Sequence, residues 1–296
     1  MIRKEALRLN FPEEAIVDFE ECYTNLRSYQ GFDSEFETIR NKIFNGKDRS
    51  FADDLKKLSE SANVNCYESD MVILLLCIPY LKALYQKRGL DESLMYETMS
   101  DLRCKLFECK SVKGVWGNFV AYWYGEFFRL TRFKLGRLEY EEITFKPSGY
   151  TNIVKNGDPI LTCHIPSEGP ICEKDVIASL RKAYEFYPQY VKDGILPVAC
   201  HSWLLFPPYK GRVFKEGSNI YAFASLFDIV EYDSNDKYSD LWRVFNIEYS
   251  EGCLSSLPED TSLQRNLKNF LLGGNLMGDA YGILLFDGEK ILTKNM

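Results

Sequence analysis

Two histidines, a cysteine and a serine are the residues of this chain best suited to proton transfer or nucleophilic attack. His164 and His201 are the only histidines, and Cys200 and Ser202 flank His201 in one run of strand-forming residues. An imidazole exchanges protons near neutral pH. Neighbours along a strand point to opposite faces, so a Cys200–His201 dyad is excluded, whereas Cys200 with His164 stays open as a thiol nucleophile. Because the histidines lack HxxxH or HxH spacing, we predict no catalytic metal.

A tyrosine and a glutamate are further candidates for acid–base chemistry. Tyr221 falls in the first turn of a predicted helix, where its phenol could protonate a leaving group or its ring could pack in the core. Glu139 lies on a predicted strand beside Glu141 and Glu142, and alternation allows only one side of that strand to face a cleft. Ser202 adds a hydroxyl on the same strand face as Cys200.

One turn, Ile165 to Cys172 (IPSEGPIC), follows a predicted strand and opens a predicted helix. Gly169 lets the backbone approach a ligand closely, and free N–H groups at a helix start can bind phosphate. Glu168 places an opposing negative charge in the same turn. The turn is therefore either an anion site or an ordinary strand-to-helix connection.

A basic turn follows the double proline Pro207-Pro208 and carries three cations, Lys210, Arg212 and Lys215. Ser218 is the predicted N-cap of the next helix. A positively charged turn ahead of a helix start can hold an anion, because the helix dipole and free N–H groups point towards it. A solvated loop is the alternative interpretation.

The elements that must position these residues divide the chain into two parts. Helical patterns run through residues 1–113, and residues 116–130 predict an aromatic helix at the junction. The later predicted elements are strands at 133–145, 159–165, 198–206, 242–247 and 281–286, and helices at 173–187, 218–229 and 258–272. We predict an α+β fold, with an all-helical N-terminal domain (residues 1–113) followed by a mixed β-sheet domain flanked by helices (residues 114–296).

Composition narrows the class of protein. The net charge of −7 disfavours a protein that coats nucleic acid. The longest uncharged apolar run, Met71 to Tyr80, is far shorter than the roughly 20 residues that cross a bilayer. The nine cysteines are irregularly spaced without a CxxC pair, and Met1 to Asn10 has no signal-peptide pattern. We expect reduced thiols in a cytoplasmic protein without membrane or nucleic-acid partners.

Five segments, in this order, resemble a known family: WYGEFFRLTRFKLGRLEYE (Trp123 to Glu141), HIPSEGPI (His164 to Ile171), CHSWLL (Cys200 to Leu205), NIYAFASLF (Asn219 to Phe227) and TSLQRNLKNFLLGG (Thr261 to Gly274). From Trp116 onward the chain resembles bacterial GNAT-like acyltransferases that have a helical N-terminal domain. The resemblance implies a GNAT-like mixed sheet that is splayed to hold acyl-CoA, the co-substrate, between two strands. It also implies transfer of the acyl group to an amine by direct attack.

The resemblance assigns roles to the candidate residues. It implies that Tyr221 protonates the leaving thiolate and that His164, Glu139 or Ser202 accepts the amine proton. It places the pyrophosphate at a helix N-terminus and the 3′-phosphate near cations. The implied cofactor-binding residues are Ser167, Gly169, Ile171, Lys210, Arg212 and Asn219.

One family feature differs in this chain. GNAT enzymes commonly carry a Gln/Arg-x-x-Gly-x-Gly/Ala pyrophosphate loop, whereas the turn of residues 166–171 has one glycine. A catalytically silent binding or interaction protein with the same fold is therefore the alternative interpretation. The sequence leaves the acceptor, the acyl chain and the oligomeric state open.

Overall fold

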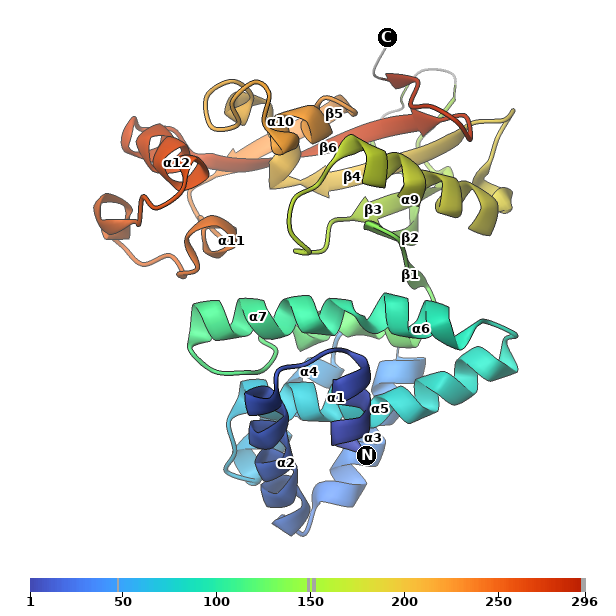
Figure 1. Cartoon of the computed structure of the whole chain (residues 1–296), viewed down its shortest axis with the longest axis vertical. Coiled ribbons are helices and arrows are strands. Elements are labelled where there is room, and N and C mark those ends of the chain that lie inside the picture. Colours follow the sequence, from blue (N-terminus) through green and yellow to red (C-terminus); the bar gives the residue numbers. More distant parts are fainter. Residues whose placement is uncertain (47, 148–149, 151–152, 294–296) are drawn as a thin grey trace. The chain divides into compact units, whose positions relative to one another are not determined.

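The computed structural model describes residues 1–46, 48–147, 150 and 153–293 (Figure 1). Two compact units make up the chain, Met1–Lys134 and Leu135–Met296. This division lies later in the chain than the boundary predicted at residue 113. The predicted α+β class is confirmed, because a helical first part is followed by a six-stranded mixed sheet with flanking helices.

Helices build the first unit, as predicted. The described residues before Gly114 form α1 (Ile2–Arg8), α2 (Glu13–Ser28), α3 (Phe32–Asn45), α4 (Phe51–Ser61), α5 (Cys66–Lys87), α6 (Glu92–Met99) and α7 (Asp101–Lys113). The side chain of Asn65 caps α5 by accepting a hydrogen bond from the Tyr67 N–H at 2.9 Å. Residues 71–78 of α5 are all buried, so this helix forms the centre of the unit.

No single helix among those described is long and apolar enough to cross a bilayer. The pair α4 and α5, which is bent by 117° at the break between the two helices, is long and apolar enough only when both are taken together, by length and composition alone.

The aromatic helix predicted for residues 116–130 is wrong. Only a 3-10 turn, η1 (Ala121–Tyr124), and one helical turn, α8 (Gly125–Phe128), form there. The chain first passes directly over the start of α5, where the Asn118 N–H donates to the Tyr67 carbonyl at 2.9 Å. A Cβ on Gly117 would lie 2.6 Å from the Tyr67 carbonyl carbon, so this approach requires glycine. The close contact overrides the helical spacing of the aromatic residues.

The sheet has the strand order β1-β2-β3-β4-β6-β5. Its strands are β1 (Arg132–Leu135), β2 (Leu138–Thr144), β3 (Pro159–His164), β4 (Leu196–Ser202), β5 (Asp228–Asn235) and β6 (Met277–Phe286). The β3–β4 pair is parallel, whereas β2–β3, β4–β6 and β5–β6 are antiparallel. The parallel pair in the middle needs a crossover connection, and α9 (Glu173–Phe186) with the 3-10 turn η2 (Pro188–Tyr190) supplies it.

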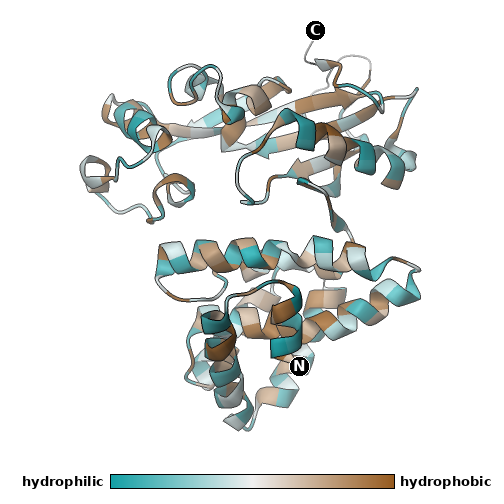
Figure 2. Cartoon of the chain, viewed as in Figure 1, coloured by the Kyte–Doolittle hydropathy of each residue, from teal (hydrophilic) through white to brown (hydrophobic). Residues whose placement is uncertain are grey.

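The two faces of the sheet pack against different parts of the second unit. On one face, Ser179 of α9 donates to the Leu135 carbonyl and lies 3.0 Å from the Tyr140 hydroxyl of β2. The other face carries a buried cluster of Phe145, Val154, Ile160, Ala199, Ile283 and Leu285. In Figure 2 the central strands β4 and β6 are largely brown, whereas the flanking α9 and α12 show brown and teal residues.

Several predicted elements differ at the edges of the second unit. Residues 133–145 form a hairpin rather than the one continuous strand that was predicted, because Gly136 adopts φ 79° in the turn between β1 and β2. The strand predicted at 198–206 ends at Ser202, and the 3-10 turns η3 (Trp203–Leu205) and η4 (Pro207–Tyr209) follow. The predicted helix at 218–229 ends early: α10 covers Asn219–Ala224, and β5 begins at Asp228.

The last predictions are partly confirmed. Residues 242–247 were predicted as a strand, but α11 (Trp242–Phe245) forms there and Asn246 ends it at φ 55°. After the 3-10 turn η5 (Cys253–Ser256), the predicted late helix forms as α12 (Ser262–Leu272). Thr261 and Gln264 make a reciprocal capping box at its start. The predicted strand at 281–286 is the second half of the longer β6.

Candidate active site

The two central parallel strands are paired with each other over only part of their length. Among the described residues, β3 and β4 share two register pairs, Leu161 with Val198 and Thr162 with Ala199. Both strands continue beyond these pairs, β3 to His164 and β4 to Ser202, while still paired with their outer neighbours β2 and β6. Facing backbone groups that have no partner strand can bind a ligand laid between them. The pairing of β3 with β4 thus stops short of their carboxyl ends, as the predicted splay requires.

One histidine stands at the end of β3. The His164 Nε2 donates to Glu141 Oε2 of β2 at 3.1 Å, and both side chains are largely enclosed. Glu139 lies directly opposite His164 in the antiparallel register and is buried, with 2% of its surface exposed. Two of the predicted base candidates, His164 and Glu139, are thus cross-strand neighbours. Alternation places Glu141 on the same face of β2 as Glu139.

The second histidine stands at the end of β4. The His201 Nε2 donates to Asp279 Oδ1 of β6 at 2.5 Å. A carboxylate only accepts hydrogen bonds, so this contact places the proton on Nε2 and leaves Nδ1 as the basic nitrogen. The His201 side chain is 61% exposed, far more than the 24% of His164. This imidazole is oriented by a carboxylate and still accessible to a second molecule.

Both histidines share one face of the sheet. Thr162 and Ala199 are register partners in a parallel pair, and each histidine lies two residues further along its strand. Two histidine–carboxylate pairs therefore flank the opening between β3 and β4. Such an arrangement can remove a proton from an incoming nucleophile on either side of a bound ligand.

The structure excludes the cysteine-nucleophile hypothesis. Cys200 is 1% exposed and points to the sheet face opposite His164. A hydrogen bond with Cys163, together with burial, raises the pKa of Cys200 well above its usual value. A buried neutral thiol is neither nucleophilic nor accessible. Ser202 lies on that same opposite face, and its hydroxyl caps η3 by accepting from the Leu204 N–H at 3.2 Å.

The turn after β3 is held by an arginine that the sequence did not single out. Arg137 donates from Nη1 to the Pro166 carbonyl at 2.8 Å and from Nη2 to the Gly169 carbonyl at 3.0 Å. Gly169 adopts φ 84°, the conformation that favours glycine. Ser167 is exposed, whereas the side chain of Ile171 is buried. A guanidinium therefore stands beside the predicted pyrophosphate turn.

The start of α9 behind this turn combines favourable and unfavourable features for an anion. Cys172 is the N-cap and makes no side-chain cap; its thiol instead donates to Asp175 Oδ2 at 2.9 Å. The first-turn N–H groups are thus left uncapped by Cys172. Glu173 and Asp175 place two negative charges in that first turn, which oppose an anion there.

The basic turn after β4 packs against its own surroundings. The Lys210 Nζ lies 5.1 Å from the centre of the Tyr221 ring, and the Arg212 guanidinium lies 4.5 Å from that of Phe270 on α12. Tyr221 is partly buried against the apolar cluster that includes Tyr209 and Phe270. Both cations are exposed, as is Asn219 at the first position of α10. Lys210 and Tyr221 are therefore neighbours, whereas Arg212 extends towards α12.

The two groups of predicted cofactor residues lie at one edge of the sheet. The turn with Ser167, Gly169 and Ile171 follows β3, and the basic turn with α10 follows β4, its parallel neighbour. Parallel strands present their carboxyl ends at the same edge. In addition, α9 and α10 contact each other, which brings the two connections together (Figure 1).

Comparison with known families agrees with this architecture. The model of the GNAT-like C-terminal domain matches residues 132–284, and that of the N-acyltransferase N-terminal domain matches residues 2–130. The chain belongs to the GNAT-like acyltransferases. This family confirms the resemblance found in the sequence. No curated protein sequence matches the chain.

Solved acyltransferase structures share the fold. An acyltransferase in complex with decanoyl-CoA and teicoplanin superposes with a TM-score of 0.72 at 20% identity, covering 95% of this chain and 86% of the other. An acyltransferase in complex with CoA and 10C-teicoplanin gives the same values. An acyltransferase in complex with decanoyl-CoA has a TM-score of 0.66 at 20% identity, covering 95% and 98% of the two chains.

Sequence reasoning missed three residues of this candidate site. Asp279 lies on the part of β6 that was not predicted as a strand, so nothing connected it with His201. Glu141 was noted only as one of three alternating glutamates, without its link to His164. Arg137 lies in a turn that was predicted as continuous strand. Its neighbour Gly136 was the available signal, since a glycine followed by a polar residue is typical of hairpin turns.

Proposed function

We propose that this protein transfers an acyl group from acyl-CoA to an amine by direct attack. The observation that carries the proposal is the splay between β3 and β4, which is flanked by two histidine–carboxylate pairs on one face. The family, with its N-acyltransferase N-terminal domain, supports acyl transfer over the catalytically silent alternative.

Acyl-CoA would enter between the splayed strands. The amide groups of its pantetheine arm match the backbone donors and acceptors on the facing edges of two separated strands. Its pyrophosphate would lie at residues 167–171, where the α9 amides and the Arg137 guanidinium stand near, and Glu173 and Asp175 limit its affinity. The 3′-phosphate would meet Lys210 and Arg212.

We assign His201 as the base that accepts the proton of the attacking amine. Its Nε2 is held by Asp279, so Nδ1 accepts the proton as the nitrogen lone pair attacks the thioester carbonyl. The imidazole is exposed, as an acceptor arriving from solvent requires. His164, the base proposed from the sequence, is more enclosed and borders Glu139 and Glu141. We assign it to the lining of the same opening, with Glu139.

Collapse of the tetrahedral intermediate breaks the carbon–sulfur bond. The leaving thiolate then takes a proton, and Tyr221 is the proposed donor. Its ring on α10 lies beside Lys210 of the basic turn, at 5.1 Å from the Nζ to the ring centre, which would place the phenol near the bound CoA. Ser202 is withdrawn from the base candidates, since its hydroxyl caps η3 on the opposite face.

The proposed donor is an acyl-CoA and the proposed acceptor is an amine, so the experiment combines one of each. Related folds hold decanoyl-CoA and teicoplanin, which supports a medium-chain acyl-CoA and an amine-bearing acceptor as first probes. Purified protein would be incubated with decanoyl-CoA and a panel of primary amines that includes teicoplanin. Mass spectrometry should detect an amide product and free CoA in equal amounts. CoA release without any acylated amine would contradict the proposal and indicate hydrolysis instead.

A further inference from the structure

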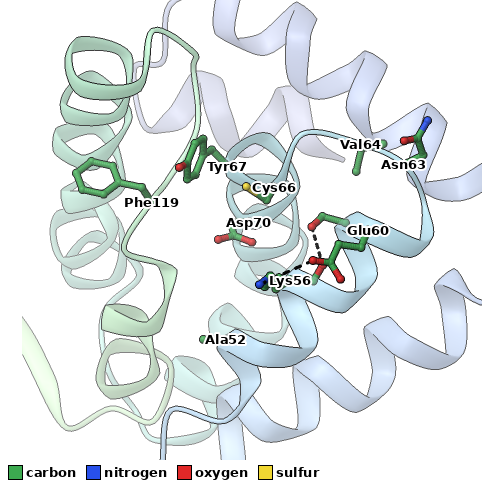
Figure 3. A pocket seen from close by; sticks show the side chains of 10 residues that line it. Ala52, Lys56, Glu60, Asn63, Val64, Cys66, Tyr67, Asp70 and Phe119 are labelled. Atoms are coloured by element: carbon green, nitrogen blue, oxygen red, sulfur yellow. Dashed lines mark hydrogen bonds and ion pairs between the residues drawn. The ribbon is translucent and has the colours of Figure 1, made fainter. Parts of the chain in front are cut away.

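A pocket of about 590 Å³ lies within the first unit. It is bounded by α4, the first turns of α5 and the segment that carries Phe119 (Figure 3). Volumes of roughly 300–1,000 Å³ are typical of small-molecule sites. The pocket combines apolar walls, formed by Val64, Tyr67 and Phe119, with charged groups from Lys56, Glu60 and Asp70.

Asp70 is the unusual residue of this pocket. Its Oδ1 is buried and has no hydrogen-bond partner among the described residues. Figure 3 shows the carboxyl group pointing into the space between α4 and the Phe119 segment. Burial raises the pKa of Asp70 well above its usual value, and no neighbouring cation offsets the effect. A buried carboxylate without a partner is costly, so a retained one suggests a ligand that supplies the missing charge.

The nearby cations are engaged elsewhere. The Lys56 Nζ lies 3.9 Å from Glu60 Oε1 in an ion pair at the rim, which cancels both charges. The Lys113 Nζ lies 5.4 Å from the Tyr67 ring centre and 5.6 Å from that of Phe119. These aromatic rings therefore already attract one ammonium group. Of the two carboxyl groups that line the pocket, Glu60 has Lys56 as its partner, whereas Asp70 has no cation partner among the described residues.

The walls are fixed before any ligand binds. The Asn118 N–H donates to the Tyr67 carbonyl, and the Val120 N–H donates to Asn118 Oδ1 at 2.8 Å. Gly117 permits the close approach over Tyr67 that these bonds require. These contacts thus fix the backbone of the segment that carries Phe119. A preformed site loses less conformational entropy when it binds a ligand.

We propose that this pocket binds a small organic monocation, a primary amine with an apolar body. The ammonium group would pair with Asp70, and the body would pack against Val64 and Phe119. A metal ion fits less well, because no group of three or more histidine, cysteine, aspartate or glutamate side chains gathers in the described part of the chain to hold one. This site is independent of the proposed acyl transfer, since all of its residues lie in the first unit.

Calorimetric titration of the full chain without acyl-CoA tests the proposal. The probes are 2-phenylethylamine and 2-phenylethanol, which share a skeleton and differ in charge. We expect the amine to bind about tenfold or more tightly than the alcohol. Asp70→Asn should reduce this preference to about twofold or less, because it removes the charge and keeps the shape. Asp53→Asn, an exposed change of the same charge on α4, should leave the preference intact.

The controls separate binding from folding. Asp70→Asn should melt at or above the temperature of the wild type, since it removes an uncompensated buried charge. Phe119→Ala should weaken both probes while the amine preference persists. Nα-acetyl-lysine amide, a mimic of a lysine in a partner protein, tests whether the cation comes from a peptide. No saturable binding of 2-phenylethylamine, or an unchanged preference in Asp70→Asn, overturns the proposal whatever the acyl-transfer assay shows.

Discussion

At the scale of single residues, the site depends on imidazoles oriented by carboxylates. A histidine alone has two tautomers, and a carboxylate bound to one nitrogen leaves the other as the base. His201 with Asp279 has this arrangement at an exposed position, and His164 with Glu141 has it at an enclosed one. The difference in exposure separates the two histidines by role, and mutagenesis can test it.

Removal of the exposed imidazole should be the most damaging change to catalysis. We predict that His201→Ala lowers kcat by about 10²-fold or more, the usual contribution of a general base. Asp279→Asn should lower kcat by at least about tenfold with little change in the KM for acyl-CoA, because it disturbs the tautomer rather than donor binding. His164→Ala is the matched comparison, and it should lower kcat less than His201→Ala does. A large loss in His164→Ala beside normal turnover in His201→Ala would reverse the assignment.

The leaving-group acid gives a second prediction. Tyr221→Phe removes one hydroxyl and keeps the ring that packs beside Lys210. We predict that it lowers turnover about tenfold or more, on the order of 1.4 kcal/mol in the barrier, while the Kd for acyl-CoA stays nearly unchanged. Tyr238→Phe, a change of the same kind elsewhere in the second unit, should leave turnover unaltered. Equal rates for Tyr221→Phe and the wild type would assign the ring to packing alone.

The residue scale is also where sequence reasoning had least power. The residue types proposed for the chemistry could be identified from the sequence, because histidine and tyrosine are few in the relevant turns and strand ends. Their partners were not, since the contact between His201 and Asp279 spans 78 positions and depends on the β4–β6 register. The role of Ser202 was misjudged for a local reason: a serine at a strand end can cap the turn that follows.

At the scale of elements, the parallel pair β3–β4 determines where a ligand can lie. The turns that follow both strands emerge at one edge, and α9 and α10 contact each other there. The sequence predicted β3, α9 and the start of α10 closely, because their apolar periodicity is strong. It missed β5, because residues 228–235 form a strand through their pairing with β6. Tertiary pairing of that kind cannot be predicted from local spacing.

A helix-capping prediction concerns α12, the helix that contacts the basic turn of Lys210, Arg212 and Lys215. The Thr261 hydroxyl accepts from the Gln264 N–H at 3.1 Å, and Asn266 of the same helix donates to the Val213 carbonyl at 3.0 Å. We predict that Thr261→Ala lowers the free energy of unfolding of the second unit by about 1 kcal/mol. Denaturant unfolding would measure it. Ser262→Ala, one residue further on, should change stability by less than about 0.5 kcal/mol; equal effects would argue against the capping role.

At the scale of the whole molecule, our two proposals concern different units of the chain. The second unit contains the splayed sheet with the candidate catalytic residues, and the first contains a preformed pocket with an unsatisfied carboxylate. The sequence predicted the order of these parts, because helical periodicity gives way to alternating strands and helices. It placed their boundary at residue 113 because the aromatic segment after it resembled a new helix. That segment instead packs over the start of α5 through Gly117 and Asn118.

The central claim is that acyl-CoA binds at the carboxyl edge of β3 and β4. Calorimetric titration of decanoyl-CoA into the purified full chain tests it most directly. We expect saturable binding at one site per chain, and a Kd raised about tenfold or more when Lys210 and Arg212 are both changed to alanine. Lys237→Ala with Arg243→Ala, a double change of equal charge on the same unit, should leave the Kd unaltered. Absence of saturable binding to the wild-type protein would contradict the account.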